Sequence, residues 1–176
     1  MRVKIFLLAI SLLCLPTAPV NALTGKVVSC SSITTGAPNI PSKKTTTLQC
    51  LDGGSPVTLE SIKGPAVINV WGSWCTPCRQ ELPHFRALAA TGKVKIIGID
   101  VEEKDLAAGR KFVIAQGMTW PNLFDKDGRT KSAFGMGVPV TWFLNSKSVV
   151  VYRQIGVINS DKLLFDEVHK YLGIKI

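Results

Sequence analysis

The chain has 176 residues and a formal net charge of +9, with 46% hydrophobic and 19% charged side chains. This length suits one domain with its own hydrophobic core, and neither an internal repeat nor a low-complexity tract supports a second domain. The basic residues are scattered and no nucleic-acid-binding motif accompanies them, so we expect no nucleic-acid partner. The positive charge instead suits an anionic cell wall or membrane surface.

Residues 1–22 have the pattern of a secretory signal peptide. Two basic residues precede an apolar run of eleven residues, Ile5–Leu15, and small residues lead up to Ala22. We predict cleavage after Ala22, which lowers the net charge from +9 to +7, and hence a secreted or cell-surface protein. A retained membrane anchor stays open, although the run is shorter than the ~20 residues that span a bilayer. A lipoprotein signal at Cys14 is disfavoured by the bulky Leu13 before it.

The four cysteines that remain after cleavage should be paired, because an exported protein enters an oxidising compartment. Cys75 and Cys78 have two residues between them and form the predicted redox pair, which leaves Cys30 and Cys50 for a structural disulfide. That disulfide would close a polar, Ser/Thr-rich loop in an N-terminal extension, residues 23–51. The alternative for Cys30 and Cys50 is a second redox pair or a metal site, although no cluster of ligand spacing accompanies them.

Residues 52–176 have the pattern of alternating strands and helices. The expected elements are strands at Val57–Glu60 and Ala66–Trp71, a helix at Cys75–Ala90, a strand at Val94–Ile99, a helix at Leu106–Ala115, strands at Val140–Leu144 and Val149–Tyr152, and a last helix capped by Asn159 or Ser160 and extending through Leu172. Pro121 and Asp127-Gly128 mark irregular structure. The alternation predicts an α/β fold, in which helices flank a parallel core sheet and the final hairpin adds antiparallel strands.

The most informative motif is Cys75-Thr76-Pro77-Cys78, which follows a buried strand and opens a helix. Free backbone N–H groups and the helix dipole favour negative charge there, so we expect Cys75 to be an exposed nucleophile with a lowered pKa. Cys78, about one turn further on, is expected to be the buried thiol that closes the disulfide. Pro77 fits the first turn, where its missing N–H costs nothing, whereas Pro83 lies inside the helix and should kink it.

The residues around this motif resemble the extracytoplasmic TlpA/ResA/DsbE-type thiol–disulfide oxidoreductases of the thioredoxin superfamily. The resemblance covers roughly residues 52–172 and is carried by three stretches, Asn69–Pro83, Phe124–Gly128 and Gly135–Leu144. It implies a thioredoxin-like fold with a central mixed sheet. It also implies an enzyme that exchanges thiols and disulfides with protein substrates, without a metal or an organic cofactor, because the cysteine pair carries the electrons.

The resemblance further implies a substrate-binding surface around the cysteine pair. The proline that corresponds to Pro139 is cis in this family and lies beside the redox pair, which leaves the Val138 backbone to bind an extended substrate segment. An ordinary strand-edge proline is the alternative. The residues expected on this surface are Trp74, Thr76, Pro77, Val138 and Pro139.

Glu81 matches an active-site glutamate of the ResA-type members. It lies three residues after Cys78 and so shares a helix face with it, where a carboxyl group could exchange a proton with the resolving thiol. A solvated helix glutamate is the alternative. Thioredoxin has an aspartate where this chain has Asn69, which shifts the acid–base role to Glu81 or water. His84 and His169, the only histidines, are interpreted as surface residues.

The resemblance favours a reductase of protein disulfides, with the haem-ligating cysteines of apocytochrome c among its expected substrates. A disulfide-forming oxidase of the same fold is the alternative. We expect a monomer, and an electron donor in the membrane is compatible with this function. A peroxidase of this fold is disfavoured, because Gly72 stands where that chemistry wants Thr or Ser. A copper-binding assembly protein would need a further ligand, and neither histidine lies in a ligand motif.

Overall fold

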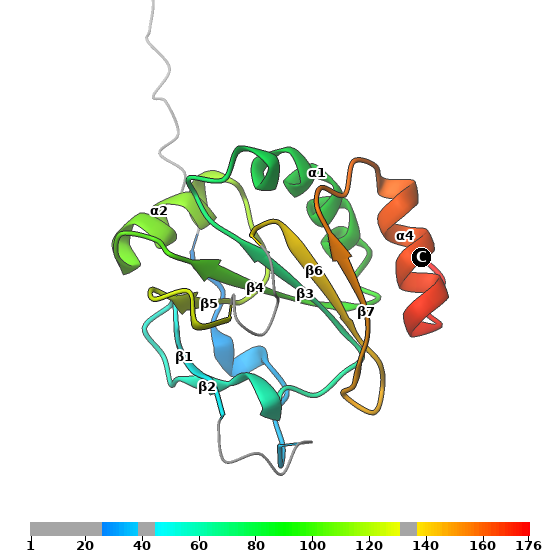
Figure 1. Cartoon of the computed structure of the whole chain (residues 1–176), viewed down its shortest axis with the longest axis horizontal. Coiled ribbons are helices and arrows are strands. Elements are labelled where there is room, and N and C mark those ends of the chain that lie inside the picture. The colour runs from blue at the N-terminus through cyan, green and yellow to red at the C-terminus, as the bar shows by residue number, and fades with distance from the viewer. Residues whose placement is uncertain (1–25, 39–44, 131–136) are drawn as a thin grey trace, which may run out of the picture.

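The computed structural model describes residues 26–38, 45–130 and 137–176 (Figure 1). The predicted signal peptide, residues 1–22, and the Gly135-Met136 part of the family pattern lie outside the described residues. Within these ranges, no helix is both long and apolar enough to cross a bilayer.

A seven-stranded mixed sheet forms the centre of the molecule, in the order β2-β1-β5-β4-β3-β6-β7 (Figure 1). Its strands are β1 (Thr47–Cys50), β2 (Val57–Thr58), β3 (Ala66–Trp71), β4 (Lys95–Val101), β5 (Asn122–Asp125), β6 (Val140–Leu144) and β7 (Val150–Ile155). The central strands β3, β4 and β5 are parallel, and the other pairs are antiparallel. The predicted parallel core with an antiparallel hairpin is therefore confirmed.

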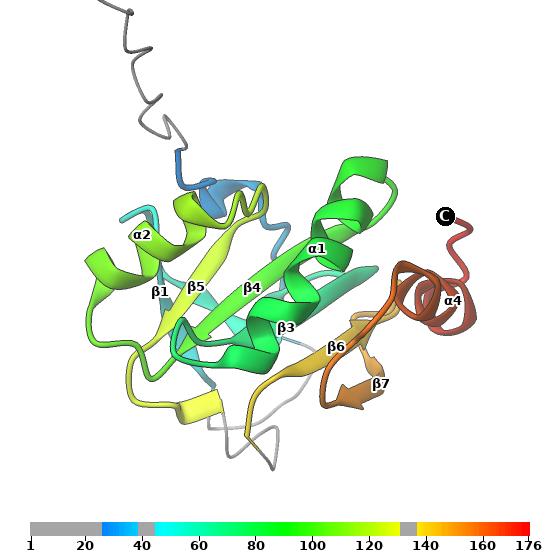
Figure 2. The same ribbon diagram turned by 90° about the horizontal axis from the view of Figure 1, so that it is seen from above.

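Apolar layers cover both faces of the sheet. Three helices of the described chain, α1 (Thr76–Thr91), α2 (Leu106–Ala115) and α4 (Asp161–Leu172), lie on one face (Figure 2). Their buried side chains pack with Trp71 and Phe143 in one cluster. The second cluster, on the opposite face, combines residues of the N-terminal segment with Ile68 and Ile99. Burial on both faces explains why β3 is a continuous apolar run instead of an alternating one.

The ends of the helices follow the capping signals in the sequence. Cys75 is the N-cap of α1, and the helix ends at Gly92, whose φ of 64° is a left-handed conformation that suits glycine. The helix continues past Pro83 to Thr91. Of the two caps expected for α4, Ser160 is the one used, since its hydroxyl accepts the backbone N–H of Leu163.

Three strand predictions need correction. The strand expected at Val57–Glu60 stops after two residues, because Leu59–Ser61 forms the short 3-10 helix η2 and the Glu60 carboxylate turns back to accept the N–H of Thr46. The segment between Pro121 and Asp127, expected to be irregular, contains β5. Strand β1 was not expected at all. Both missed strands are four residues long, and they pair with each other across more than seventy residues of sequence.

Cys30 and Cys50 form a disulfide, as expected, with their Cα atoms 6.0 Å apart. It joins the 3-10 helix η1 (Cys30–Ser32) to β1, and both cysteines are buried. The Asp52 carboxyl group lies close to both sulfur atoms, a grouping compatible with a metal site. Sulfur atoms bonded to each other are not thiolate ligands, however, so the metal-site alternative is not supported in this state.

Replacing both cysteines, as Cys30→Ala/Cys50→Ala, should lower the free energy of unfolding by about 3 kcal/mol, because the disulfide closes a loop of about twenty residues in the unfolded chain. Guanidinium unfolding followed by tryptophan fluorescence measures this difference. The parent protein and a Ser146→Ala variant in the exposed β6–β7 turn serve as controls. A variant as stable as the parent would show that the link contributes nothing to folding.

Candidate active site

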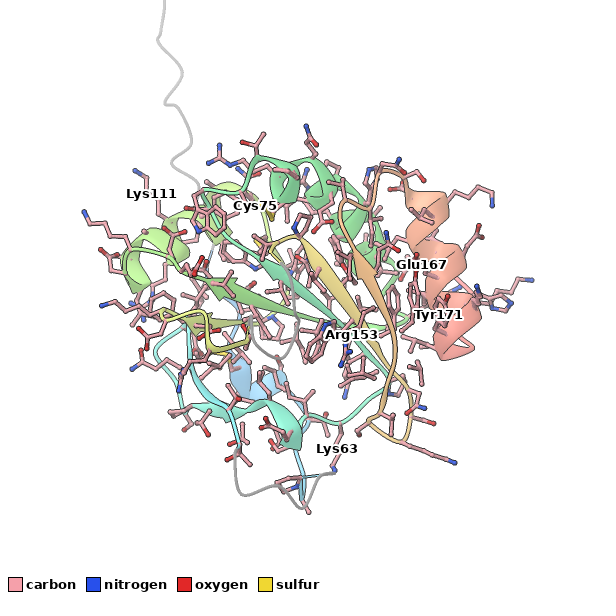
Figure 3. All side chains as sticks on the ribbon, in the orientation of Figure 1. Lys63, Cys75, Lys111, Arg153, Glu167 and Tyr171 are labelled. Atoms are coloured by element: carbon pink, nitrogen blue, oxygen red, sulfur yellow. A yellow bond between two sulfur atoms is a disulfide. The ribbon has the colours of Figure 1, made fainter. Side chains whose placement is uncertain are left out.

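Cys75 and Cys78 form a second disulfide, where the sheet passes into α1 (Figure 3). Their Cα atoms lie 5.3 Å apart. Cys75 has an extended backbone and caps the helix, and its Sγ accepts the backbone N–H of Cys78 at 3.1 Å. A donor held at this position also stabilises a thiolate on Cys75 after reduction, in addition to the effect of the helix dipole.

Both cysteines are nearly covered in the oxidised state. Cys75 is 4% exposed and Cys78 is 1% exposed, because both pack into the cluster under the helices. The expectation of an exposed Cys75 is therefore wrong for the disulfide form. The residues between them, Thr76 and Pro77, are exposed, and Trp74 on the other side of Cys75 is 49% exposed. These three expected binding residues thus form the accessible surface around the disulfide.

The turn before Cys75 is fixed from three directions. The backbone N–H of Ser73 donates to Glu103 Oε2 at 3.1 Å, and the Ser73 carbonyl accepts the guanidinium of Arg79, whose Nε lies at 3.0 Å. The indole Nε1 of Trp74 donates to the carbonyl of Val101 at 3.2 Å. Contacts from Val101 at the end of β4, from Glu103 just after it and from Arg79 of α1 therefore set the direction in which the chain enters the helix.

Gly72 is required by the position of Trp74. A Cβ atom at position 72 would lie 2.6 Å from the Trp74 indole nitrogen, closer than side chains approach. A peroxidase of this fold would have Thr or Ser at this position, and either side chain would have to displace the indole. The packing of Trp74 therefore agrees with the argument against a peroxidase.

Glu81 is fully buried, which excludes the alternative of a solvated helix glutamate. Its Oε1 accepts the Asn69 amide at 2.7 Å, and its Oε2 accepts the backbone N–H of Ile158 at 3.2 Å. Burial raises the pKa of Glu81 to about 7, against the opposing effect of these two hydrogen bonds. A carboxyl group that titrates near neutral pH, one turn after Cys78, is suited to accept and return a proton.

The Val138–Pro139 peptide bond is cis, as the resemblance implies. The pairing of Val140 with Val70 places Pro139 at the carboxyl end of β3, where the chain turns towards Cys75. Val138 packs against the cluster that contains both cysteines of the pair. The structure thus brings the two halves of the family pattern to the same end of the sheet.

Neither histidine is shown to contact the cysteine pair. His84 Nδ1 is 2.6 Å from Asp161 Oδ1, so this side chain links α1 to the start of α4. His169 is exposed in the last turn of α4. Neither belongs to a metal-ligand cluster within the described ranges.

Two buried acids beside the site were not expected from the sequence. Glu103 is 8% exposed and holds Ser73, and Asp100 is fully buried in β4. The one available signal was the position of Asp100 inside the apolar run that forms β4, where an unpaired acid is uncommon.

The chain matches the family described as AhpC/TSA over residues 37–164. It belongs to this family. The thiol-disulfide oxidoreductase ResA of Bacillus thuringiensis (strain Al Hakam) is 36% identical over 106 residues, which cover 58% of this chain and 61% of that protein. The thiol:disulfide interchange protein DsbE of Pseudomonas fluorescens biotype C is 32% identical over 114 residues, 64% of each chain. The chain therefore spans about three fifths of the length of the curated relatives it matches.

Solved structures confirm the thioredoxin-like fold. The structure of MTB dsbF is 28% identical, with a TM-score of 0.63, and the match covers 72% of this chain and 94% of that one. A secreted Mycobacterium tuberculosis disulfide oxidoreductase, described as homologous to E. coli DsbE, is 26% identical with a TM-score of 0.61, over 71% and 95% of the two chains. The resemblance to ResA and DsbE drawn from the sequence is confirmed.

The raised pKa of Glu81 predicts a pH-dependent stability. The folded protein holds the Glu81 proton up to about pH 7, whereas the unfolded chain releases it near 4.5, so stability is lost as the pH rises between these values. Glu81→Gln removes this loss, and the Asn69 side-chain oxygen, which has no hydrogen-bond partner among the described residues of the parent, can accept from the new amide if the Asn69 amide flips. Relative to the parent, the variant should gain on the order of 3 kcal/mol between pH 4 and pH 8.

Denaturant unfolding of the oxidised protein across this pH range measures the difference, since disulfide cysteines do not titrate. Asp166→Asn, at an exposed position on α4, controls for general effects of charge. A difference between Glu81→Gln and the parent that stays constant with pH would contradict the raised pKa.

Proposed function

We propose that the protein is an extracytoplasmic thiol–disulfide oxidoreductase that reduces disulfides in other proteins. The observation that carries the proposal is the Cys75–Cys78 disulfide at the N-terminus of α1, where the Cys78 N–H reaches the Cys75 sulfur at 3.1 Å. Relatives whose names describe thiol–disulfide oxidoreduction support the same chemistry.

The reaction starts from the reduced protein. The Cys75 thiolate attacks one sulfur of a substrate disulfide, so that a mixed disulfide forms and the other substrate sulfur leaves as a thiolate that takes up a proton. Cys78 then loses its proton and attacks the Cys75 sulfur, which releases the second substrate thiolate. Two electrons pass to the substrate and the Cys75–Cys78 disulfide remains. A separate dithiol donor must reduce it again, and a donor in the membrane fits this step.

Glu81 serves as the proton acceptor for Cys78 in this scheme. It lies one turn along α1, is shielded from solvent, and is oriented by Asn69 and the Ile158 N–H. Because burial raises its pKa to about 7, it is present in both protonation states near neutral pH. Asn69, where thioredoxin has an acid, acts here as the group that holds this carboxyl in place.

Substrate binding is assigned to the accessible rim of the disulfide. Trp74, half exposed, offers an apolar face on one side of Cys75, and Thr76 and Pro77 are exposed between the cysteines. Across the site, the Val138–Pro139 segment lies directly before the start of β6 and is available to pair with an extended stretch of substrate. We expect protein disulfides as substrates, including the disulfide between the haem-ligating cysteines of apocytochrome c, and a monomeric enzyme.

An extracytoplasmic location is supported by two observations. The buried Cys30–Cys50 disulfide is of the structural kind that persists in oxidising compartments, and a structural neighbour at 26% identity is a secreted protein. The predicted signal peptide, with cleavage after Ala22, supplies the route.

Trapping tests the order of attack. A Cys78→Ser variant should accumulate a mixed disulfide between Cys75 and a model protein disulfide, because the resolving thiol is missing. The matched control, Cys75→Ser, should form none. The product is measured by non-reducing electrophoresis and peptide mapping. A mixed disulfide carried by Cys78 in the control and absent from the first variant would reverse the assigned roles.

The reduction potential tests the direction of electron flow. A reductase should have a potential near or below about −270 mV, the value of thioredoxin, whereas a disulfide-forming oxidase should lie near −120 mV. Equilibration with glutathione and dithiothreitol buffers, read by the change in tryptophan fluorescence, gives the value. A potential near the oxidase value would assign the protein to the alternative function and leave the exchange chemistry in place.

A further inference from the structure

Asp100 is a buried carboxyl group that the proposed exchange does not use. It lies in β4 between Trp71 of β3 and Phe124 of β5 and is fully buried. Neither of its carboxyl oxygens has a hydrogen-bond partner among the described residues. On the helix side, the space is closed by α2, where a Cβ atom on Gly109 would lie 2.2 Å from Asp100 Oδ2.

This environment favours the neutral acid. A carboxylate without partners is strongly disfavoured in an apolar interior. Burial, and next the neighbouring Glu103, raise the pKa of Asp100 to about 8. At neutral pH, the group therefore carries a proton.

Glu103 connects Asp100 to the redox site. Its Oε2 accepts the N–H of Ser73 at 3.1 Å and its Oε1 accepts the N–H of Lys104 at 3.2 Å. The charge of the Glu103 carboxylate in turn opposes ionisation of Asp100. A charged acceptor makes the stronger hydrogen bond to Ser73, two residues before Cys75.

Two arginines on the neighbouring helices α2 and α1 are engaged elsewhere. On α2, the guanidinium of Arg110 donates to the carbonyl of Leu51 and interacts with Asp52. On α1, the guanidinium of Arg79 donates to the carbonyl of Ser73. Asp105, at the start of α2, caps that helix through the N–H of Ala108. Glu103 is thus the charged group that acts on Asp100.

We propose that Asp100 is a positioning residue of the redox site: its proton keeps Glu103 bound to Ser73 and thereby fixes the turn that presents Cys75. When the proton passes to solvent, a second negative charge arises beside Glu103, the bond to Ser73 weakens, and the Cys75 thiolate is disfavoured. Exchange at Cys75 then slows. This inference rests on the proposed function only in taking Cys75 as the nucleophile.

The first test measures the proton directly. In oxidised protein labelled with carbon-13 at its aspartate carboxyl groups, one resonance should titrate near pH 8 and should be absent from Asp100→Asn. Selective labelling excludes Glu81 and the other glutamates. Titration of every aspartate below about pH 5, near the ordinary value for this side chain, would overturn the proposal.

The second test measures the consequence at Cys75. Alkylation of reduced protein by iodoacetamide is followed from pH 6 to pH 10 in a Cys78→Ser/Glu81→Gln background. The two substitutions remove the second thiol of the redox pair and the titration of Glu81, so that the profile reports on Cys75 and Asp100. The observed rate constant should fall about threefold below the value expected for a single ionisation of Cys75 as Asp100 ionises, because a smaller fraction of Cys75 is then thiolate. Asp100→Asn and Glu103→Gln should abolish this fall, and the exposed control Asp166→Asn should retain it.

Glu103→Gln keeps an oxygen acceptor for Ser73 and leaves Asp100 intact, so the test stands even where Asp100→Asn fails to fold. A fall of the same size in Glu103→Gln as in the background protein would overturn the proposal. A protein that shows both the aspartate titration and the fall at Cys75, yet forms no mixed disulfide with protein substrates, would support this inference and contradict the proposed function alone.

Discussion

The position of Cys75 depends on how Trp71 is held at the end of β3. Trp71 is fully buried, its indole Nε1 donates to Asn122 Oδ1 at 3.1 Å, and its ring stacks on Phe112 of α2 at 5.0 Å between centroids. Gly98 makes room for this contact, since a Cβ there would lie 1.8 Å from the same Asn122 oxygen. An anchored indole at the last residue of the strand fixes the start of the turn, and the contacts of Ser73 and Trp74 fix the rest. Helix α1 therefore begins directly after Cys75, with the N–H of Cys78 directed at the Cys75 sulfur.

The role of a buried acid with a raised pKa depends on the groups that it contacts. Glu81 and Glu167 both have a pKa raised to about 7 by burial, but Glu167 lies on α4, far along the chain from the cysteines, near Tyr171 (Figure 3). Glu81 instead shares a helix with Cys78 and is held by two donors. Asp100 has no donor, but its neighbour Glu103 binds the turn before Cys75. A shifted pKa alone does not mark a functional group, and the contacts decide which of these acids can act on the cysteines.

Local signals in the sequence were enough for the elements that carry them. Helix α2 was expected at its observed bounds, because its apolar spacing is helical and acidic residues precede it, and β3 was evident as a continuous apolar run. Strands β1 and β5 were missed because each is short and is stabilised by its distant partner, as in the pairing of Gln49 with Phe124. The burial of Glu81 could not be predicted from the local sequence either. One of its hydrogen bonds comes from the N–H of Ile158, seventy-seven residues away. The cysteine pair and Pro139 were identified from motifs, whereas the acids that surround them required the tertiary structure.

Asn122 joins the structural disulfide to the redox site, which explains why β1 and β5 matter for the chemistry. Its side-chain oxygen holds Trp71, its side-chain amide donates to the Trp120 carbonyl at 2.7 Å, and its backbone carbonyl accepts the N–H of Leu51 at 2.9 Å. The sulfur atoms of Cys30 and Cys50 lie 3.6 Å and 3.8 Å from that same carbonyl oxygen. The disulfide thus packs on the residue that anchors Trp71, four positions before Cys75. The segment interpreted from the sequence as a stapled extension is, through β1 and this contact, part of the support that holds the active-site turn.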